Sequence, residues 1–177
     1  SVRCGGFGMS NLDVLRAARE ARPDAFIIYK PHPDVESGNR QGAISDAEVL
    51  RHADIILRDF PMGRLLPLVH EVHTLTSQTG FEALLRGVKV MTYGGPFYAG
   101  WGLTEDRQSF PRRKARLTLD DLVAGTLLLY PSYYDWQTGN FCRAEDVCCR
   151  LLQPDGQMRG RVWARLASVV RGLLRRM

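Results

Sequence analysis

Short apolar runs alternate with segments of helical periodicity along most of this chain. The apolar runs predict strands at residues 25–29, 55–57, 72–75 and 88–93. Between them, apolar positions three and four residues apart predict helices at 12–21, at 46–52, from Pro61 onward and at 80–86. Strands that are separated by helices pair in parallel, with helices on both faces of the sheet. The pattern therefore predicts an α/β fold with a Rossmann-like parallel sheet.

Three residues are expected to mark the ends of these helices. Asn11 is a suitable N-cap for the first helix, and Pro61 suits the first turn of the helix that it opens. Gly87 is a suitable stop for the helix at 80–86.

The alternation stops after Leu129. Residues 130–142 are rich in aromatic side chains and predict an irregular connection, and 144–152 predict a helix. Residues 159–177 alternate arginines with apolar residues and contain no acid, which predicts a basic amphipathic helix. The expected organisation is a Rossmann-like domain at 1–129, a connection with a helix at 130–158, and a terminal helix at 159–177.

The turn between the third strand and its helix has the composition of an anion site. A strand that ends in small polar residues and opens a helix directs free backbone N–H groups toward a ligand. Glycine in such a turn lets the backbone approach the ligand closely. The residues concerned are Ser77, Gln78, Thr79 and Gly80. An alternative is that Thr79 and Glu82 form a capping box, since they have its spacing.

A second polar segment follows the first strand. Pro31 and Pro33 hold the chain extended, which fixes the directions of Lys30 and His32. Such a lysine and histidine suit a phosphate or carboxylate, although His32 is alternatively a structural histidine. Ligands of open α/β sheets gather outside the carboxyl ends of the strands, where both segments are expected.

A glycine-rich run with several aromatic rings follows residue 93. Its rings offer flat surfaces for a base or a sugar, or alternatively they cap the sheet edge. Arginines follow, which either bind a sugar carboxylate or form a solvated turn. The candidate ligand-binding residues of this loop are Gly95, Phe97, Tyr98, Gly100, Trp101, Arg107, Arg112 and Arg113.

The composition fits a globular protein. A chain of 177 residues with 45% hydrophobic residues is sufficient for one compact domain. No apolar run has the length of a membrane span, and no signal peptide is recognisable. The four cysteines lack metal-ligand spacing, so no metal is expected. Because Ser1 is not a methionine, the chain is expected to be part of a longer cytoplasmic protein.

Four segments together resemble the bacterial capsule polysaccharide synthesis family, in particular its β-Kdo glycosyltransferase branch. They are YKPHPD, SQTGFEALLRG, residues 92–104 and the LLYP segment at 128–131, in the family's order over roughly residues 10 to 140. The resemblance implies the C-terminal half of a GT-B glycosyltransferase that transfers Kdo from CMP-Kdo with retention. It implies no cofactor beyond this donor substrate.

The resemblance also implies roles for single residues. Lys30, His32 and the turn at 77–80 would hold the CMP phosphate, and Glu82 would accept from the ribose hydroxyls. The relatives carry an acidic segment just before the position of Ser1, and no nucleophile is assigned in this chain. His32 and Asp34 are weak candidates for it.

The expected partners follow from the same resemblance and from the terminal helix. They are a nucleotide sugar, a lipid-linked saccharide acceptor, an N-terminal GT-B domain and other capsule-assembly proteins. The basic helix either lies on the anionic inner membrane, which makes the protein peripheral to it, or packs on the N-terminal domain. Nucleic acid is not expected, because the arginines are concentrated in one helix. Alternative functions are a UDP-sugar epimerase-like enzyme and a non-catalytic docking module.

Overall fold

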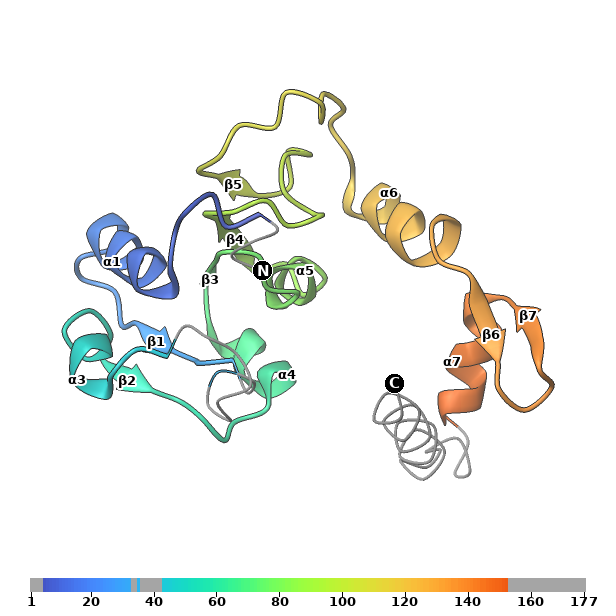
Figure 1. Cartoon of the computed structure of the whole chain (residues 1–177), viewed down its shortest axis with the longest axis horizontal. Helices are drawn as coiled ribbons and strands as arrows, with labels where there is room; N and C mark the ends of the chain where they lie inside the picture. Colours follow the sequence, from blue (N-terminus) through green and yellow to red (C-terminus); the bar gives the residue numbers. More distant parts are fainter. Residues whose placement is uncertain (1–4, 33–34, 36–42, 153–177) are drawn as a thin grey trace, which may run out of the picture. The chain divides into compact units, whose positions relative to one another are not determined.

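The chain, shown in Figure 1, consists of two compact units, of which the first ends at Leu122 and the second begins at Val123. The sequence predicted this boundary after Leu129. The computed structural model describes residues 5–32, 35 and 43–152. The predicted terminal helix at 159–177 and the candidate Asp34 lie outside these residues. No helix in the described ranges has the length and apolar character needed to cross a bilayer.

The strands of the first unit pair in parallel, as the alternating pattern predicted. Strand β1 (Ile28–Tyr29) pairs with β2 (Ile55–Ile56). Strand β3 (Glu71–Thr74) pairs with β4 (Lys89–Thr92), which pairs with β5 (Glu105–Asp106). These are two separate sheets, with the orders β1-β2 and β3-β4-β5. The sequence did not predict β5, because its two acidic residues form no apolar run.

Helices connect these strands. They are α1 (Asn11–Ala21), α3 (Asp46–Val49), α4 (Met62–Leu65) with the 3₁₀ turn η1 (Leu66–Leu68), and α5 (Thr79–Leu84). Gly87 follows α5 with a φ of 70°, which confirms the predicted stop, since a left-handed residue ends a helix.

The N-cap of α1 is Ser10, so the prediction of Asn11 is wrong. The Ser10 hydroxyl accepts the Asp13 N–H at 3.2 Å, and the Asp13 carboxylate accepts the Ser10 N–H at 2.8 Å. This reciprocal pair requires a carboxylate three residues after the cap. Asn11 has Val14 in that position, which explains why the helix begins one residue earlier.

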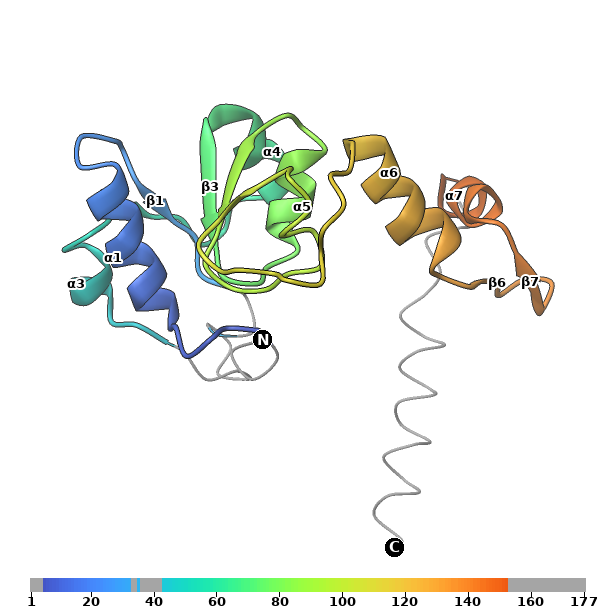
Figure 2. The ribbon, with the colours of Figure 1, turned by 90° about the horizontal axis from the view of Figure 1, so that it is seen from above.

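Figure 2 shows α1 beside β1, and residues of α1 pack in the cores of both sheets of the first unit. Val14 packs in a buried cluster with Leu75, Met91 and Tyr93 on the β3-β4 side. Its neighbour Leu15 packs in another cluster, with Val49, Ala53 and partly buried residues from β1 and β2. One helix thus contributes to both hydrophobic cores.

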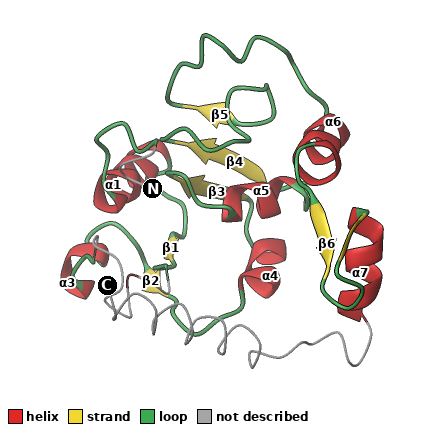
Figure 3. Cartoon of the chain, turned by 45° about the vertical axis from the view of Figure 1, so that its right-hand side comes forward, coloured by secondary structure: helices red, strands yellow, loops and turns green. Residues whose placement is uncertain are grey.

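The second unit contains a hairpin that the sequence did not predict. After the π-helical segment Ala124–Leu129, strands β6 (Tyr133–Asp135) and β7 (Asn140–Cys142) pair antiparallel. Gly139 has a φ of 74°, which suits the tight turn between them. The buried Asp135 carboxylate is 3.2 Å from the Arg150 guanidinium. Arg150 belongs to α7 (Ala144–Leu152), which agrees with the predicted helix and lies beside β6 (Figure 3).

Candidate functional site

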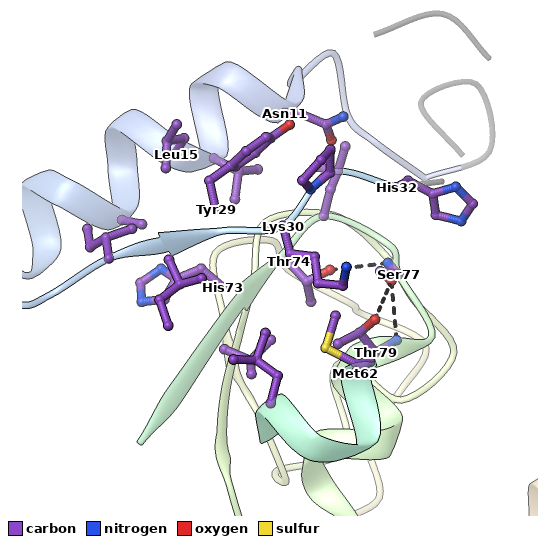
Figure 4. Close-up of a pocket in the computed structure, with 18 of the residues that line it drawn as sticks. Asn11, Leu15, Tyr29, Lys30, His32, Met62, His73, Thr74, Ser77 and Thr79 are labelled. Carbon is purple, nitrogen blue, oxygen red and sulfur yellow. Dashed lines mark hydrogen bonds between the residues drawn. The ribbon is translucent and has the colours of Figure 1, made fainter. Parts of the chain in front are cut away.

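A cleft of about 1860 Å³ lies between β1 and β3 of the first unit (Figure 4). Helices α1 and α4 and the turn after β3 contribute to its walls. The structure brings both predicted polar segments to this cleft. The predicted donor-site residues that line it are Lys30, His32, Ser77, Gln78, Thr79 and Glu82.

Hydroxyl groups order the turn between β3 and α5. The Ser77 N–H donates to the buried Thr74 hydroxyl at 3.2 Å. The Ser77 hydroxyl lies 3.0 Å from the Thr79 hydroxyl and accepts the Thr79 N–H at 3.2 Å. These bonds hold the Ser77 and Thr79 side chains together at the wall of the cleft (Figure 4). Hydroxyl groups placed in this way can donate hydrogen bonds to the oxygens of an anion such as a phosphate.

The alternative of a capping box at this helix is wrong. The N-cap of α5 is Gln78, and its side chain makes no capping hydrogen bond. Thr79 is the first residue of the helix, whereas a capping box would require it to be the residue before the helix. Glu82 is therefore not tied to a cap and lines the cleft one turn into α5.

Lys30 enters the cleft from the end of β1. Its ammonium group donates to the Arg58 carbonyl oxygen at 2.5 Å and lies 3.5 Å from the Leu57 carbonyl oxygen. These contacts join the ends of β1 and β2. Among the described residues, the partners of the Lys30 ammonium group are these two carbonyl oxygens, and Lys30 itself lines the cleft. His32, farther along this segment, is exposed and also lines the cleft.

Gly80 does not line the cleft and packs against the Tyr98 ring. The fully buried Tyr98 donates its hydroxyl hydrogen to the Ser77 carbonyl oxygen at 2.5 Å. A Cβ atom on Gly80 would lie 2.6 Å from the Tyr98 ring carbon Cζ. The close approach that the absent side chain of Gly80 permits in this structure is the one to the Tyr98 ring. Burial raises the pKa of Tyr98, which keeps the hydroxyl a donor.

Contacts with neighbouring segments of the chain hold the rest of the glycine-rich loop. The Trp101 indole donates to the Phe97 carbonyl oxygen at 2.8 Å. The Arg113 guanidinium donates to the Pro96 carbonyl oxygen at 2.7 Å and lies 4.7 Å from the centre of the Phe110 ring. The Gly95 N–H donates to the Gly5 carbonyl oxygen at 2.7 Å.

None of the predicted ligand-binding residues of this loop lines the cleft. Gly100 has a φ of 81° and packs against Phe110. Arg107 reaches the Met91 sulfur at 3.3 Å, and Arg112 is exposed. Tyr98 cannot offer a stacking face, because its ring is fully buried. Its ring packs against the turn at Ser77 and Gly80 instead.

Charged side chains line the opposite end of the cleft, where β3 begins. His73 Nε2 lies 2.7 Å from the Glu71 carboxylate, and His73 Nδ1 lies 2.9 Å from the Tyr93 hydroxyl. Arg22 pairs with the other Glu71 oxygen at 2.9 Å. Burial lowers the pKa of His73, although Glu71 opposes this. Burial raises the pKa of Glu71, but Arg22 and His73 outweigh it and leave this pKa below its ordinary value.

The sequence analysis did not find this group. The available signal was the alternation in β3, which places Glu71 and His73 two residues apart on one face of the strand. Within the described ranges, no three His, Cys, Asp or Glu side chains are grouped as a metal site would require.

Residues 2–134 match the family model described as "Capsule polysaccharide biosynthesis protein". The chain is 56% identical over 143 residues to the capsule polysaccharide modification protein LipA of Neisseria meningitidis serogroup A, which covers 81% of this chain and 20% of LipA. It is 42% identical over 142 residues to the lipopolysaccharide-processing protein LpsZ of Rhizobium meliloti, which covers 80% of this chain and 32% of LpsZ.

Solved structures agree with these sequence matches. The fold is similar to Thermosulfurimonas dismutans KpsC, beta Kdo 2,7 transferase, with a TM-score of 0.76 and 42% identity over 85% of this chain and 49% of that chain. The KpsC beta Kdo 2,4 transferase gives a TM-score of 0.71 and 34% identity. The chain thus spans about a fifth to a third of the curated relatives and about half of the solved transferases.

Proposed function

The chain belongs to the capsule polysaccharide biosynthesis protein family, and from this premise we propose that it supplies the donor-nucleotide site of a Kdo glycosyltransferase. The donor in this proposal is CMP-Kdo, and the acceptor is a lipid-linked, Kdo-primed saccharide. The chain would form the C-terminal half of a GT-B enzyme, and transfer would retain the anomeric configuration.

The observation that carries the proposal is the cation and the hydroxyl pair at one cleft wall. Lys30 comes from the end of β1, whereas Ser77 and Thr79 come from the end of β3. A phosphate offers several acceptor oxygens with negative charge, so a lysine and neighbouring hydroxyls are suitable donors for it. Nucleotide phosphates commonly bind where parallel strands end.

Glu82 is the proposed partner of the ribose. Its carboxylate is an acceptor for two hydroxyl donors, and it lines the cleft one turn after Thr79. The freedom of Glu82 from a capping role favours this proposal. A deoxyribose would lose one of these donors.

In this proposal, catalysis of the transfer requires groups that this chain does not supply. A retaining transfer needs a carboxylate or an equivalent group to stabilise an oxocarbenium-like state, and we assign none among the described residues. We expect that group and the acceptor site to come from an additional GT-B domain. The basic segment at 159–177 would attach the enzyme to an anionic membrane surface, where a lipid-linked acceptor is located.

The proposal is tested by calorimetric titration of the whole chain with CMP, UDP and cytidine. We expect CMP to bind, and cytidine to bind more weakly because it lacks the phosphate. A preference for UDP over CMP would contradict the CMP-Kdo assignment and favour an epimerase-like enzyme. Absence of binding for all three would contradict a nucleotide site.

A further inference from the structure

A run of cationic side chains follows β5, in the long loop that leads to the next helix (Figure 1). Residues 107–119 contain five arginine or lysine residues and no aspartate or glutamate. Several other arginines of the first unit pair with carboxylates, among them Arg16, Arg19, Arg22 and Arg58. The run therefore concentrates positive charge in one short segment, and such a concentration attracts anionic ligands.

Arg113 anchors this segment to the glycine-rich loop. Its guanidinium donates to the Pro96 carbonyl oxygen at 2.7 Å and lies 5.6 Å from the centre of the Trp101 ring. Farther along, the Leu117 N–H donates to the Trp101 carbonyl oxygen at 3.0 Å. Contacts at both ends thus fix the path of the backbone between Arg113 and Leu117.

Three cations of the run are exposed on this anchored segment. They are Arg112, Lys114 and Arg116. A Cβ atom on Gly102 would lie 3.4 Å from the Arg116 Cγ atom, so the stem of Arg116 lies on the backbone next to Trp101. The exposed charges therefore belong to the same surface as the Trp101 ring.

Trp101 supplies an aromatic ring among these cations. Its indole N–H donates to the Phe97 carbonyl oxygen at 2.8 Å, which fixes the orientation of the ring, and the residue is partly exposed. A ring of this kind beside cations suits a ligand that has both apolar C–H faces and anionic groups. A carboxylated sugar has both, because its carboxylate accepts paired hydrogen bonds from a guanidinium while its ring presents C–H groups.

The run begins at the sheet edge that also carries the proposed phosphate ligands. Strands β3, β4 and β5 pair in parallel, so their carboxyl ends are at one edge. The Arg107 N–H donates to the Thr92 carbonyl oxygen at 2.8 Å where the chain leaves β5. The turn with Ser77 and Thr79 leaves β3 at the same edge. A saccharide bound by the run is therefore on the side of the sheet where the donor nucleotide is proposed.

We propose that Trp101, Arg112, Lys114 and Arg116 form a binding surface for an acidic saccharide, outside the cleft, which recognises sugar carboxylates. The identity of the saccharide rests on the proposed function, in which the acceptor is Kdo-primed and each Kdo residue carries a carboxylate. The surface holds the carboxylated sugars of the acceptor, while the cleft holds the nucleotide. Binding at this surface requires no nucleotide, so the two sites can be tested separately.

The test uses a trisaccharide of galacturonic acid as the carboxylated probe and maltotriose as a neutral probe of the same length. NMR of the whole chain without nucleotide follows the Trp101 indole N–H and the backbone amides of 112–117. We expect trigalacturonate to shift these signals and to bind more weakly as salt is added, because salt screens exposed charges. Maltotriose should leave the signals unchanged at the same concentration.

Matched variants separate this surface from the net charge of the protein. The first variant carries Arg112→Gln, Lys114→Gln and Arg116→Gln. The control carries Arg51→Gln, Arg64→Gln and Lys89→Gln, at exposed positions of the same unit, and loses the same charge. We expect trigalacturonate affinity to fall about tenfold in the first variant and to change by less than about twofold in the control, because each exposed ion pair contributes little alone and three contribute together.

Absence of shifts in the wild-type protein, or an equal loss of affinity in the two variants, would overturn the proposal. A single-stranded thymidine tetranucleotide, which carries three phosphates, is titrated in parallel. Tighter binding of this oligonucleotide than of trigalacturonate at the same amides would assign the surface to phosphate polymers and overturn the saccharide.

CMP titration distinguishes this proposal from that of the donor site. We expect the first variant to bind CMP as the wild-type protein does, because none of its three changed residues lines the cleft. Failure of the wild-type protein to bind CMP, with trigalacturonate binding intact, would contradict the nucleotide site alone.

Discussion

The hydroxyl of the fully buried Tyr98 donates to the carbonyl of Ser77 at 2.5 Å, so a ring from the glycine-rich loop holds the turn that carries the proposed phosphate ligands. We expect Tyr98→Phe to lower the free energy of unfolding by about 1–3 kcal/mol, because the Ser77 carbonyl loses a buried donor. Urea unfolding and CMP titration measure the effect, and CMP affinity should also fall. Tyr130→Phe, at a residue that is 90% exposed, is the control. Unchanged stability would contradict the role of this hydrogen bond.

Gly80→Ala should destabilise the first unit, because the added Cβ would meet the Tyr98 ring. Overpacking of this kind costs about 1–3 kcal/mol, and the displaced turn should also bind CMP less tightly. The control is Gly63→Ala in α4, where the nearest atom would be at an ordinary 3.8 Å. Equal melting temperatures for the two variants would show that the ring yields to a methyl group.

Lys30→Met should weaken CMP binding by about 1–3 kcal/mol, the range for a hydrogen bond to a charged group. The binding of cytidine should not change, because it has no phosphate for the lysine to neutralise. Lys89→Met removes an exposed lysine from the first residue of β4 and serves as the control. If Lys30→Met weakens CMP and cytidine equally, the lysine acts only through its contacts with Leu57 and Arg58.

Glu82→Gln should reduce CMP affinity and leave the melting temperature unchanged, because Glu82 caps no helix. Binding of 2′-deoxy-CMP distinguishes a ribose contact from a general charge effect. Wild-type protein should prefer CMP over its deoxy form, and the variant should lose most of this preference. A lower melting temperature with intact CMP binding would assign Glu82 to a structural role.

Acidification should destabilise the first unit through His73. Burial lowers the pKa of His73 in the folded state, whereas the unfolded chain has a histidine pKa of about 6.5. Below that pH the unfolded state therefore takes up the proton more readily, and the free energy of unfolding falls until the pH reaches the folded pKa. Urea unfolding between pH 5 and pH 8 should show that the free energy of unfolding depends less steeply on pH in His73→Gln than in the wild-type protein.

Sequence periodicity predicted the part of the fold that depends on apolar runs. Strands β1, β2 and β4 lie within the predicted ranges and are shorter, β3 is shifted by one residue, and helix α7 has the predicted bounds. Strands β5 and β6-β7 were missed, since they contain acidic or exposed aromatic residues and form through pairing with a neighbour. Such pairing depends on tertiary context rather than on local preference.

The candidate site was predictable to the same extent. The positions of Lys30 and Ser77 at strand ends were sufficient to bring them to one cleft. The burial of Tyr98 under Gly80 was not predictable, because a ring beside glycines is equally suited to a ligand or to a core. The Glu71, His73 and Tyr93 contacts depend on the register of β3 and β4, which no single segment determines.

Val14 and Leu15 are adjacent in α1, yet each packs in the core of a different sheet. The helix therefore acts as a spacer of fixed width between β1 and β3. The gap cannot widen or close without removing one of these side chains from its core. A spacer of this kind holds the polar walls of the cleft at one separation before any ligand binds. The free energy of binding is therefore not reduced by the entropic cost of bringing these walls together.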